Sequence, residues 1–154
     1  MTHSTNNGYY NLEHLESERI ILYPLSDGEV TDGDTNTWYI IVNKADNLPI
    51  GRIGMVHRHP EWKNTRLQII IQDEEKRGEG YGLEALELLE KYIFDILAYQ
   101  RIAVRIAGFN KAAVRFFKKA GYKLEGVQEL GCLYNDKYYD VILLRLLRNE
   151  YVNR

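Results

Sequence analysis

The chain has a single cysteine, Cys132, among its 154 residues, so no disulfide can form within it and a zinc site is not expected. It lacks an apolar run near the roughly 18 residues of a membrane-spanning helix, and no signal peptide opens it. Basic residues are not in excess: the net charge is −2, which does not indicate nucleic-acid binding. We therefore expect a cytoplasmic protein with no metal, membrane or nucleic-acid partner.

Length and composition predict one domain, residues 1–154. Hydrophobic residues make up 45% of the chain and charged residues 27%, which is ordinary for a globular protein. Residues 1–17 are polar without a clear period and are expected to form a flexible, arm-like N-terminus. Segment 26–37 is an acidic loop by composition. We interpret it as a solvated turn; the alternative is that its charge attracts a cationic amine.

Alternating or continuous apolar runs predict strands along most of the chain. A short turn at 43–47 separates two of these runs, and another around 135–137 separates the last two, so both pairs are expected to form hairpins. The strands are expected at 18–25, 38–42, 50–57, 64–71, 101–106, 122–127, 129–134 and 138–147.

Two helices are expected between these strands. The second begins at Asn110, whose side-chain oxygen can accept a hydrogen bond from the first turn, and ends before Gly121. Together with the strands they predict an α+β fold with a mostly antiparallel mixed sheet. The first helix follows Gly82, with the apolar residues Leu86, Leu89, Ile93 and Ile96 on one face and Glu84, Glu87, Glu90 and Lys91 largely on the other.

A glycine-rich loop lies between the strand at 64–71 and the first helix. Such a loop leaves backbone N–H groups pointing outward at a helix N-terminus, and with the helix dipole they form an anion site. The spacing Gly78, Gly80, Gly82 fits neither the dinucleotide fingerprint G-x-G-x-x-G nor the P-loop G-x-x-x-x-G-K-[ST]. The alternative to an anion site is a turn that binds nothing.

The run 77–82 (RGEGYG) fits the pattern R/Q-x-x-G-x-G/A and resembles the acyl-CoA loop of the GNAT N-acetyltransferase superfamily. Residues 110–122 (NKAAVRFFKKAGY) resemble the family's second CoA segment. Residues 124–126 and 136–141 resemble the branch that holds the ribosomal-protein alanine and spermidine acetyltransferases. The resemblance runs from about residue 38 to residue 147. It implies a GNAT-like mixed sheet with helices on both faces.

By this resemblance the co-substrate is acetyl-CoA, and the glycine loop holds its pyrophosphate with backbone N–H groups. The strand before the loop would splay from its neighbour, so that its backbone pairs with the pantetheine arm and one N–H polarises the thioester carbonyl. Arg77 would add positive charge, or would simply be solvated. The implied cofactor-binding residues are Ile70, Ile71, Arg77, Gly78, Glu79, Gly80, Tyr81, Gly82, Asn110 and Phe117.

Acetyl transfer to an amine needs a base for the ammonium and an acid for the leaving thiolate. The sequence departs from the family at both: Phe117 stands where a tyrosine is common, and Arg66 where a glutamate is common. Either the thiolate leaves unassisted or through water, since a free thiol has a pKa of about 8.5, or another residue serves. The predicted catalytic residues are Glu129, Tyr134 and His57, with His59 and Tyr138 as alternatives and Cys132 interpreted as an ordinary strand residue.

The two helices that in relatives lie between the first two strands are replaced here by about a dozen loop residues. The acceptor pocket is therefore expected to be shallow, or to be completed by another subunit of a homo-oligomer through the aromatic C-terminal hairpin. The predicted function is N-acetyltransferase, moving acetyl directly to a primary amine of a small molecule such as a polyamine or an amino sugar. The alternatives are an N-terminal peptide or protein acetyltransferase, a non-catalytic acetyl-CoA-binding module, and a structural domain whose loop binds nothing.

Overall fold

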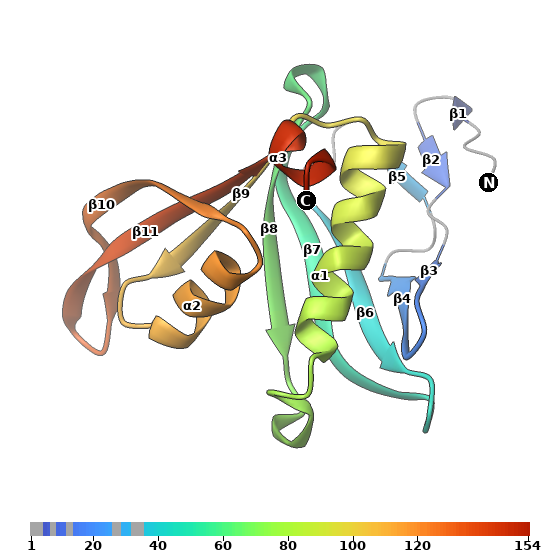
Figure 1. Ribbon diagram of the computed structural model, residues 1–154, viewed down its shortest axis with the longest axis horizontal. Helices are drawn as coiled ribbons and strands as arrows, with labels where there is room; N and C mark the ends of the chain where they lie inside the picture. Colours follow the sequence, from blue (N-terminus) through green and yellow to red (C-terminus); the bar gives the residue numbers. More distant parts are fainter. Residues whose placement is uncertain (1–4, 7–8, 12–13, 26–28, 32–35) are drawn as a thin grey trace.

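The computed structural model describes residues 5–6, 9–11, 14–25, 29–31 and 36–154. Its main sheet has the strand order β10-β11-β9-β8-β7-β6-β4-β3 (Figure 1). Three short strands, β1 (Thr5–Asn6), β2 (Tyr9–Asn11) and β5 (Glu29–Thr31), form a small separate sheet. The main strands are β3 (Leu15–Glu16), β4 (Ile20–Pro24), β6 (Thr37–Asn43), β7 (Leu48–His59), β8 (Asn64–Ile71), β9 (Arg101–Ala107), β10 (Lys123–Tyr134) and β11 (Lys137–Leu147).

In the main sheet β8 and β9 pair in parallel, whereas every other neighbouring pair is antiparallel. The predicted α+β fold with a mixed, mostly antiparallel sheet is therefore confirmed. The last two strands form the predicted hairpin, whose turn residues Asn135 and Asp136 have φ of 49° and 61°, as a tight type I′ turn requires. None of the described helices is long and apolar enough to cross a membrane.

The helices lie on one side of the sheet among the described residues. These are α1 (Tyr81–Lys91), which continues as the wider turn η3 (Tyr92–Ile96), α2 (Lys111–Lys119) and the short α3 (Arg148–Val152), with single turns η1 (Pro60–Trp62) and η2 (Glu74–Lys76). Both α1 and α2 stand in front of the sheet in Figure 1 and bury side chains in one core, against alternate residues of β9. The expected placement of helices on both faces is thus corrected to one face.

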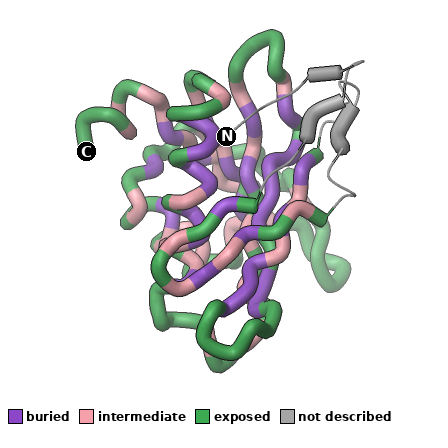
Figure 2. Tube along the Cα trace, turned by 90° about the vertical axis from the view of Figure 1, so that its right-hand side faces the viewer, coloured by how far each residue is buried: buried purple, intermediate pink, exposed green. Residues whose placement is uncertain are grey.

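The buried face of α1 follows the predicted stripe at Leu86, Leu89 and Ile93. Figure 2 shows that the buried residues lie mainly in the middle of the molecule. Ile96 departs from it, with 46% of its surface exposed. The helix widens before this residue, and the N–H of Leu97 bonds the carbonyl of Tyr92 five residues earlier. A wider turn rotates the following side chains away from the 3.6-residue period, so Phe94 is buried instead.

Glu90 is a second correction, because it was placed on the solvent face and is fully buried. Its carboxylate accepts hydrogen bonds from the Tyr122 hydroxyl at 2.7 Å and from Arg154 Nη1 at 3.1 Å. Burial raises the pKa of Glu90, while these two donors oppose that rise. The C-terminal residue covers this part of α1, and a helical pattern cannot reveal a partner 64 positions away.

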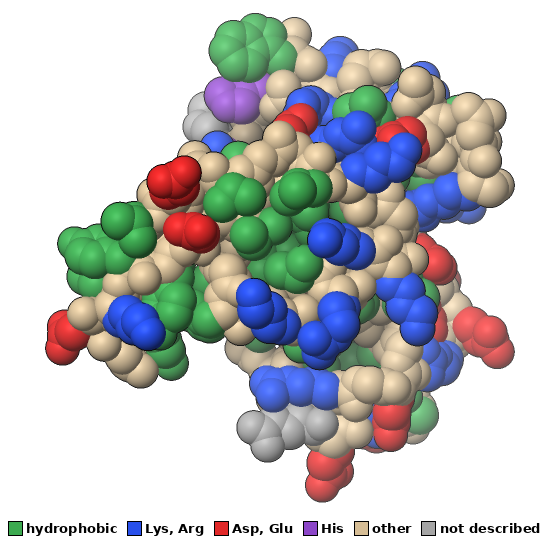
Figure 3. Space-filling view, turned by 60° about the vertical axis from the view of Figure 1, so that its left-hand side comes forward, with side chains coloured by type: hydrophobic (Ala, Val, Ile, Leu, Met, Phe, Trp, Pro, Cys, Tyr) green, Lys and Arg blue, Asp and Glu red, His purple; other side chains and the backbone are tan. Residues whose placement is uncertain are grey.

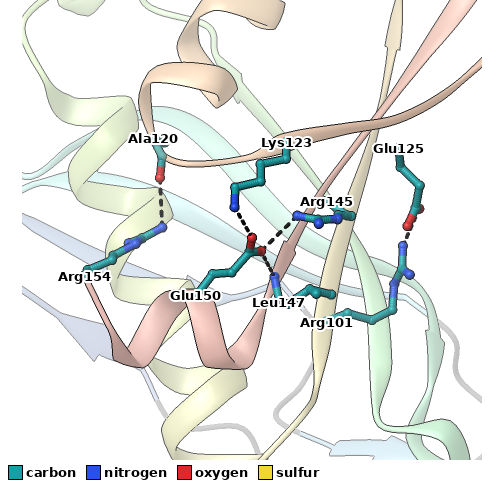
Figure 4. A network of polar contacts seen from close by, with 8 residues as sticks. All are labelled: Arg101, Ala120, Lys123, Glu125, Arg145, Leu147, Glu150 and Arg154. Atoms are coloured by element: carbon teal, nitrogen blue, oxygen red, sulfur yellow. Dashed lines mark hydrogen bonds and ion pairs between the residues drawn. The ribbon is translucent and has the colours of Figure 1, made fainter.

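The C-terminal segment is joined to the sheet through Glu150 (Figure 4). Its carboxylate accepts from Lys123 Nζ at 2.6 Å, from Arg145 Nη1 at 2.9 Å and from the N–H of Leu147 at 3.0 Å. These contacts connect β10, β11 and the start of α3. The hydrogen bonds from Lys123 and the Leu147 N–H lower the pKa of Glu150 to about 2.

We expect Glu150→Gln to lower the free energy of unfolding by about 1 kcal/mol at pH 7, the usual net value of such partly exposed contacts. Because the folded-state pKa lies below the unfolded one, the ionised carboxylate stabilises the fold above about pH 4.3 and loses this effect as pH falls towards 2. Urea denaturation at pH 7 and pH 3 measures the difference in free energy of unfolding between this variant and the parent protein, with the exposed Glu87→Gln as control. A difference of equal size at both pH values would contradict the assignment.

Candidate active site

The parallel strands β8 and β9 diverge soon after they start. Their pairing covers Asn64–Arg101, Thr65–Ile102 and Arg66–Ala103 and goes no further, although β8 runs to residue 71 and β9 to residue 107. Past this point β8 remains paired with β7, and β9 remains paired with β11. Among the described strands, the edge of β8 from residue 67 to 71 therefore has no partner on the β9 side. Such a free edge is able to pair with an extended ligand.

The glycine loop leads from β8 into α1. Gly78 and Gly80 have φ of 81° and 86°, a left-handed backbone that side chains disfavour. Gly80 is the residue before α1, and no side chain caps the helix there. The first N–H groups of α1 are thus left available for an anion, as the predicted loop 77–82 requires. Arg77 lies at the edge of the loop, where its Nε donates to the carbonyl of Ile71 at 2.9 Å.

Arg19 of the N-terminal half supports this loop. Its guanidinium lies 4.1 Å from the centre of the Tyr81 ring, and its Nη1 donates to the carbonyl of Glu79 at 3.1 Å. Its Nε pairs with Glu84 in the first turn of α1 at 2.7 Å, and Glu84 also accepts from the Ser17 hydroxyl. Burial alone would raise the pKa of Glu84, but these hydrogen bonds outweigh it and hold the pKa below its ordinary value.

A cleft of about 190 Å³ opens between the diverging strands on the helix side. Three of the predicted cofactor residues line it: Ile70 of β8, Asn110 before α2, and Phe117 within α2. The Asn110 side chain accepts from the N–H of Ala113 at 3.2 Å, so the predicted helix cap is confirmed. Phe117 is buried edge-on against Tyr122 and offers the cleft only hydrocarbon.

A second hollow, of about 250 Å³, shares Leu67, Gln68, Arg105 and Ala107 with the first. In β9, Arg105 and Ala107 alternate with the buried core residues, so this hollow opens on the sheet face away from α1 and α2. A third hollow, of about 370 Å³, continues along the same face. On the side where β10 and β11 project, Figure 3 shows hydrophobic side chains gathered centrally with Lys and Arg along much of their border.

Of the three predicted catalytic residues, His57 is the one that lies beside the gap between the diverging strands β8 and β9. It ends the regular part of β7 with φ of 49°, and its N–H donates to Asn36 Oδ1 at 3.1 Å. Its side chain is exposed and lines both hollows on the open face, which is the sheet face away from α1 and α2. His59 lines only the larger one, where its ring stacks on Trp62 with centroids 5.0 Å apart.

The other two predicted catalytic residues line none of the three hollows. Glu129 is exposed in the irregular stretch of β10 where pairing with β11 is interrupted. Tyr134 is 54% exposed at the hairpin end, with its ring 4.9 Å from that of Phe109. Tyr138, at the same end, is also exposed. The geometry therefore separates these side chains from the gap between β8 and β9.

Sequence reasoning did not select Gln68 and Arg105, which line the gap from opposite strands. Cys132, interpreted as an ordinary strand residue, lines the second hollow, with its Sγ 3.6 Å from the carbonyl oxygen of Tyr139. In the part of the chain that the structure describes, no group of three His, Cys, Asp or Glu side chains is arranged to hold a metal ion.

The acetyltransferase (GNAT) domain family model matches residues 10–123, and the chain belongs to this family. A prophage-derived, uncharacterized N-acetyltransferase of Bacillus subtilis (strain 168) is 30% identical over 75 residues, covering 49% of this chain and 42% of that protein. The spermidine N(1)-acetyltransferase of Escherichia coli (strain K12) is 27% identical over 109 residues, covering 71% and 55%. The chain thus spans about half the length of the curated relatives it matches.

Solved structures of similar fold include the spermidine/spermine N-acetyltransferase from Vibrio cholerae, with a TM-score of 0.73 and 24% identity over 80% of this chain and 71% of that one. A dodecameric structure of the Vibrio cholerae spermidine N-acetyltransferase gives a TM-score of 0.73 and 24% identity, covering 79% and 70%. The expected GNAT fold, resembling the branch with spermidine acetyltransferases, is confirmed.

Proposed function

We propose that the protein is an acetyl-CoA-dependent N-acetyltransferase that moves the acetyl group directly to a primary amine of a small molecule. The gap between β8 and β9 carries this proposal, because it opens to a hollow on each side of the sheet and begins beside an uncapped helix N-terminus. Family membership and the names of the relatives support it. They also support a polyamine as one acceptor to test.

In this proposal the glycine loop binds the pyrophosphate with the first N–H groups of α1. The pantetheine arm lies in the helix-side cleft along residues 67–71 of β8, and an unpaired N–H of that edge donates to the thioester carbonyl. The acceptor enters from the opposite hollow. Its nitrogen lone pair attacks the carbonyl carbon, the new C–N bond forms, and the C–S bond breaks with its electron pair on sulfur.

Two protons must move in this reaction. The ammonium form of the acceptor gives one to a base, for which His57 is the proposed residue because it lines the acceptor hollow. The thiolate needs the other, and Phe117 cannot supply it. After the attack the nitrogen still carries one proton more than the amide product. We propose that this proton passes to water in the hollow and that water protonates the thiolate after it leaves, since a free thiol with a pKa of about 8.5 is an acceptable leaving group near neutral pH.

We also propose a cytoplasmic homo-oligomer. The dodecameric relative supports assembly, and β10, the edge strand of the sheet, exposes Leu124, Val127, Leu130 and Leu133. Exposed apolar residues on an edge strand are a usual site of association. Sedimentation of the purified protein measures the state, and a monomer at all concentrations would contradict it.

Thiol release from acetyl-CoA in the presence of pooled polyamines, amino sugars, amino acids and short peptides tests the function. Release with one pool supports the acetyltransferase and identifies its acceptor class. Binding of CoA without release in any pool would favour a non-catalytic module. A CoA excess of 100-fold over Kd should raise stability by about 2.7 kcal/mol, so the absence of any thermal shift would favour a domain that binds no CoA.

We expect Arg19→Gln to weaken CoA binding about three- to tenfold, because the loop loses a partly exposed charge-assisted hydrogen bond to Glu79 and the cation over Tyr81. Calorimetric titration with CoA measures this. The control is Lys91→Gln on the exposed side of α1. Equal affinities for the two variants would show that Arg19 supports the fold but not the loop.

A further inference from the structure

The charged side chains around the hollows of 250 Å³ and 370 Å³ indicate which kind of amine can bind there as the acceptor. We propose that the acceptor carries an oxyanion, a carboxylate or a phosphate, beside its amine, and that Arg66 and Arg105 bind this group. The inference rests on the proposed function and narrows its substrate class. It differs from a polyamine acceptor, which has positive charge at each amine and none of the opposite sign.

Arg66 is the first part of this argument. It lies on β8 at the last paired position before the strands diverge, between Val56 of β7 and Ala103 of β9 in the register. Its side chain is half-buried and lines both hollows of the open face. Within the described residues its guanidinium has neither an ion-pair partner nor a hydrogen-bond acceptor. A half-buried guanidinium without an acceptor is a ready site for an anion, since all its N–H donors are free.

Arg105 supplies a second charge to the same place. It follows Ala103 by two positions in β9, so its side chain points to the same sheet face as that of Arg66. It lines all three hollows and therefore reaches the gap itself. Its Nη2 donates to Gln128 Oε1 at 2.7 Å, and this neutral amide orients the guanidinium without cancelling its charge.

Negative charge is scarce in these hollows among the described residues. The described residues that line the 250 Å³ hollow include no carboxylate. Glu125 lines the larger one, but it forms an ion pair with Arg101, which lines that hollow as well (Figure 4). The acidic residues Asp27, Asp32 and Asp34, considered as an attraction for a cationic amine, fall outside the described residues. The guanidinium groups of Arg66 and Arg105 are therefore not neutralised here.

Electrostatics in a partly enclosed hollow favour an oxyanion over a second ammonium. Two guanidinium groups repel a polyamine, whereas each can donate two parallel hydrogen bonds to one carboxylate or phosphate. The amine must reach the gap beside Gln68 while the oxyanion stays on the arginines. A hollow of about 250 Å³ suits an acceptor the size of an amino acid or a small phosphorylated amino sugar.

Matched acceptors that differ by one oxyanion test this. Lysine and cadaverine differ by a carboxylate, and glucosamine 6-phosphate and glucosamine by a phosphate, so the two pairs distinguish the two anions. We expect kcat/KM from thiol release to favour the anionic member of at least one pair about tenfold or more at 50 mM salt, with the ratio falling at 500 mM. Equal or better use of both cationic members would overturn the proposal.

The variant Arg66→Gln tests whether Arg66 causes the preference for the anionic acceptor. It should bring the ratio within a pair to near one, mainly by raising KM for the anionic member. Arg52→Gln is the matched control, because Arg52 lies on β7 over the Trp38 ring at 4.8 Å and lines none of the hollows. A ratio that Arg66→Gln leaves unchanged, or that Arg52→Gln changes equally, would overturn the assignment.

Direct binding separates this inference from the proposed function. Calorimetric titration of the CoA-saturated protein with each acceptor needs no turnover. If no acceptor releases thiol, the acetyltransferase proposal fails, yet tighter binding of an anionic member that Arg66→Gln abolishes would still support the anion site. Equal binding of both members, or binding of none at millimolar concentration, would overturn it.

Discussion

Gly51→Ala should lower the free energy of unfolding by about 3 kcal/mol, at the upper end of overpacking effects. Gly51 of β7 pairs with Ile71 of β8, and a Cβ at this position would lie 2.2 Å from the carbonyl oxygen of Ile70 and 2.9 Å from the Ile71 Cα. Both neighbours are backbone atoms, so no side chain can turn aside. The end of β8 must move, and this is the edge proposed to pair with the pantetheine arm.

The same change should therefore weaken CoA binding in the protein that remains folded. Urea denaturation measures the first effect, and calorimetric titration with CoA below the unfolding transition measures the second. Gly126→Ala is the control, since a Cβ there would meet only a Leu143 methyl at 3.8 Å. Similar midpoints for the two variants would show that β7 and β8 tolerate a larger separation than their register indicates.

Features governed by local sequence were predicted well. The strand at 64–71 has the expected bounds, because its apolar run is delimited by Asn64 and by the glycine loop. Asn110 caps α2 and Gly121 follows that helix with φ of 103°, both through hydrogen-bonding and steric properties of the residue itself. The divergence of β8 from β9 agrees with the splayed strand that the family resemblance implied.

Features governed by distant partners were not predicted. Glu90 has the spacing of a solvent-facing residue and is buried because Tyr122 and Arg154 supply its donors. The one-sided placement of the helices agrees with the short connection between β4 and β6. The sequence showed that the helices of relatives are missing there, but the expected fold still carried the family's helices on both faces. Periodicity describes one element, whereas these outcomes depend on what packs against it.

The candidate site also combines residues that local sequence predicts with residues that only the fold brings together. The loop 77–82 was found because its three glycines lie at alternate positions in one short segment, and two of them, Gly78 and Gly80, have a left-handed backbone. Arg66 and Arg105 are 39 positions apart, and only the parallel register of β8 and β9 puts them on one face of one gap. Arg66 was noticed as a departure from the family, but its consequence for the acceptor needed the neighbouring charges. Those charges lie on other strands, so the side-chain pattern of β8 alone cannot reveal them.

His57→Asn should lower kcat about 100-fold near neutral pH, the lower part of the range for losing a general base. His57 is the one imidazole lining the 250 Å³ hollow among the described residues, where the other ionisable side chains are two arginines and Cys132. Asparagine is the suitable replacement because it tolerates the left-handed φ of 49° at this position, so the backbone bond to Asn36 is kept. Amide groups do not accept a proton in this pH range, so the amine must lose its proton to water.

The pH dependence separates a base from a residue that only positions the acceptor. An acceptor with an amine pKa of about 10 deprotonates by itself as pH rises, so the deficit of His57→Asn should shrink from pH 7 to pH 10 if the imidazole removes a proton. A positioning role predicts a constant deficit, and a wholly solvated side chain predicts none. His59→Asn is the informative comparison, because that ring stacks on Trp62 and lies 3.4 Å from Glu61. If His59→Asn shows the larger, pH-dependent loss, the acceptor enters through the 370 Å³ hollow, and Arg101 and Glu125 become its neighbours.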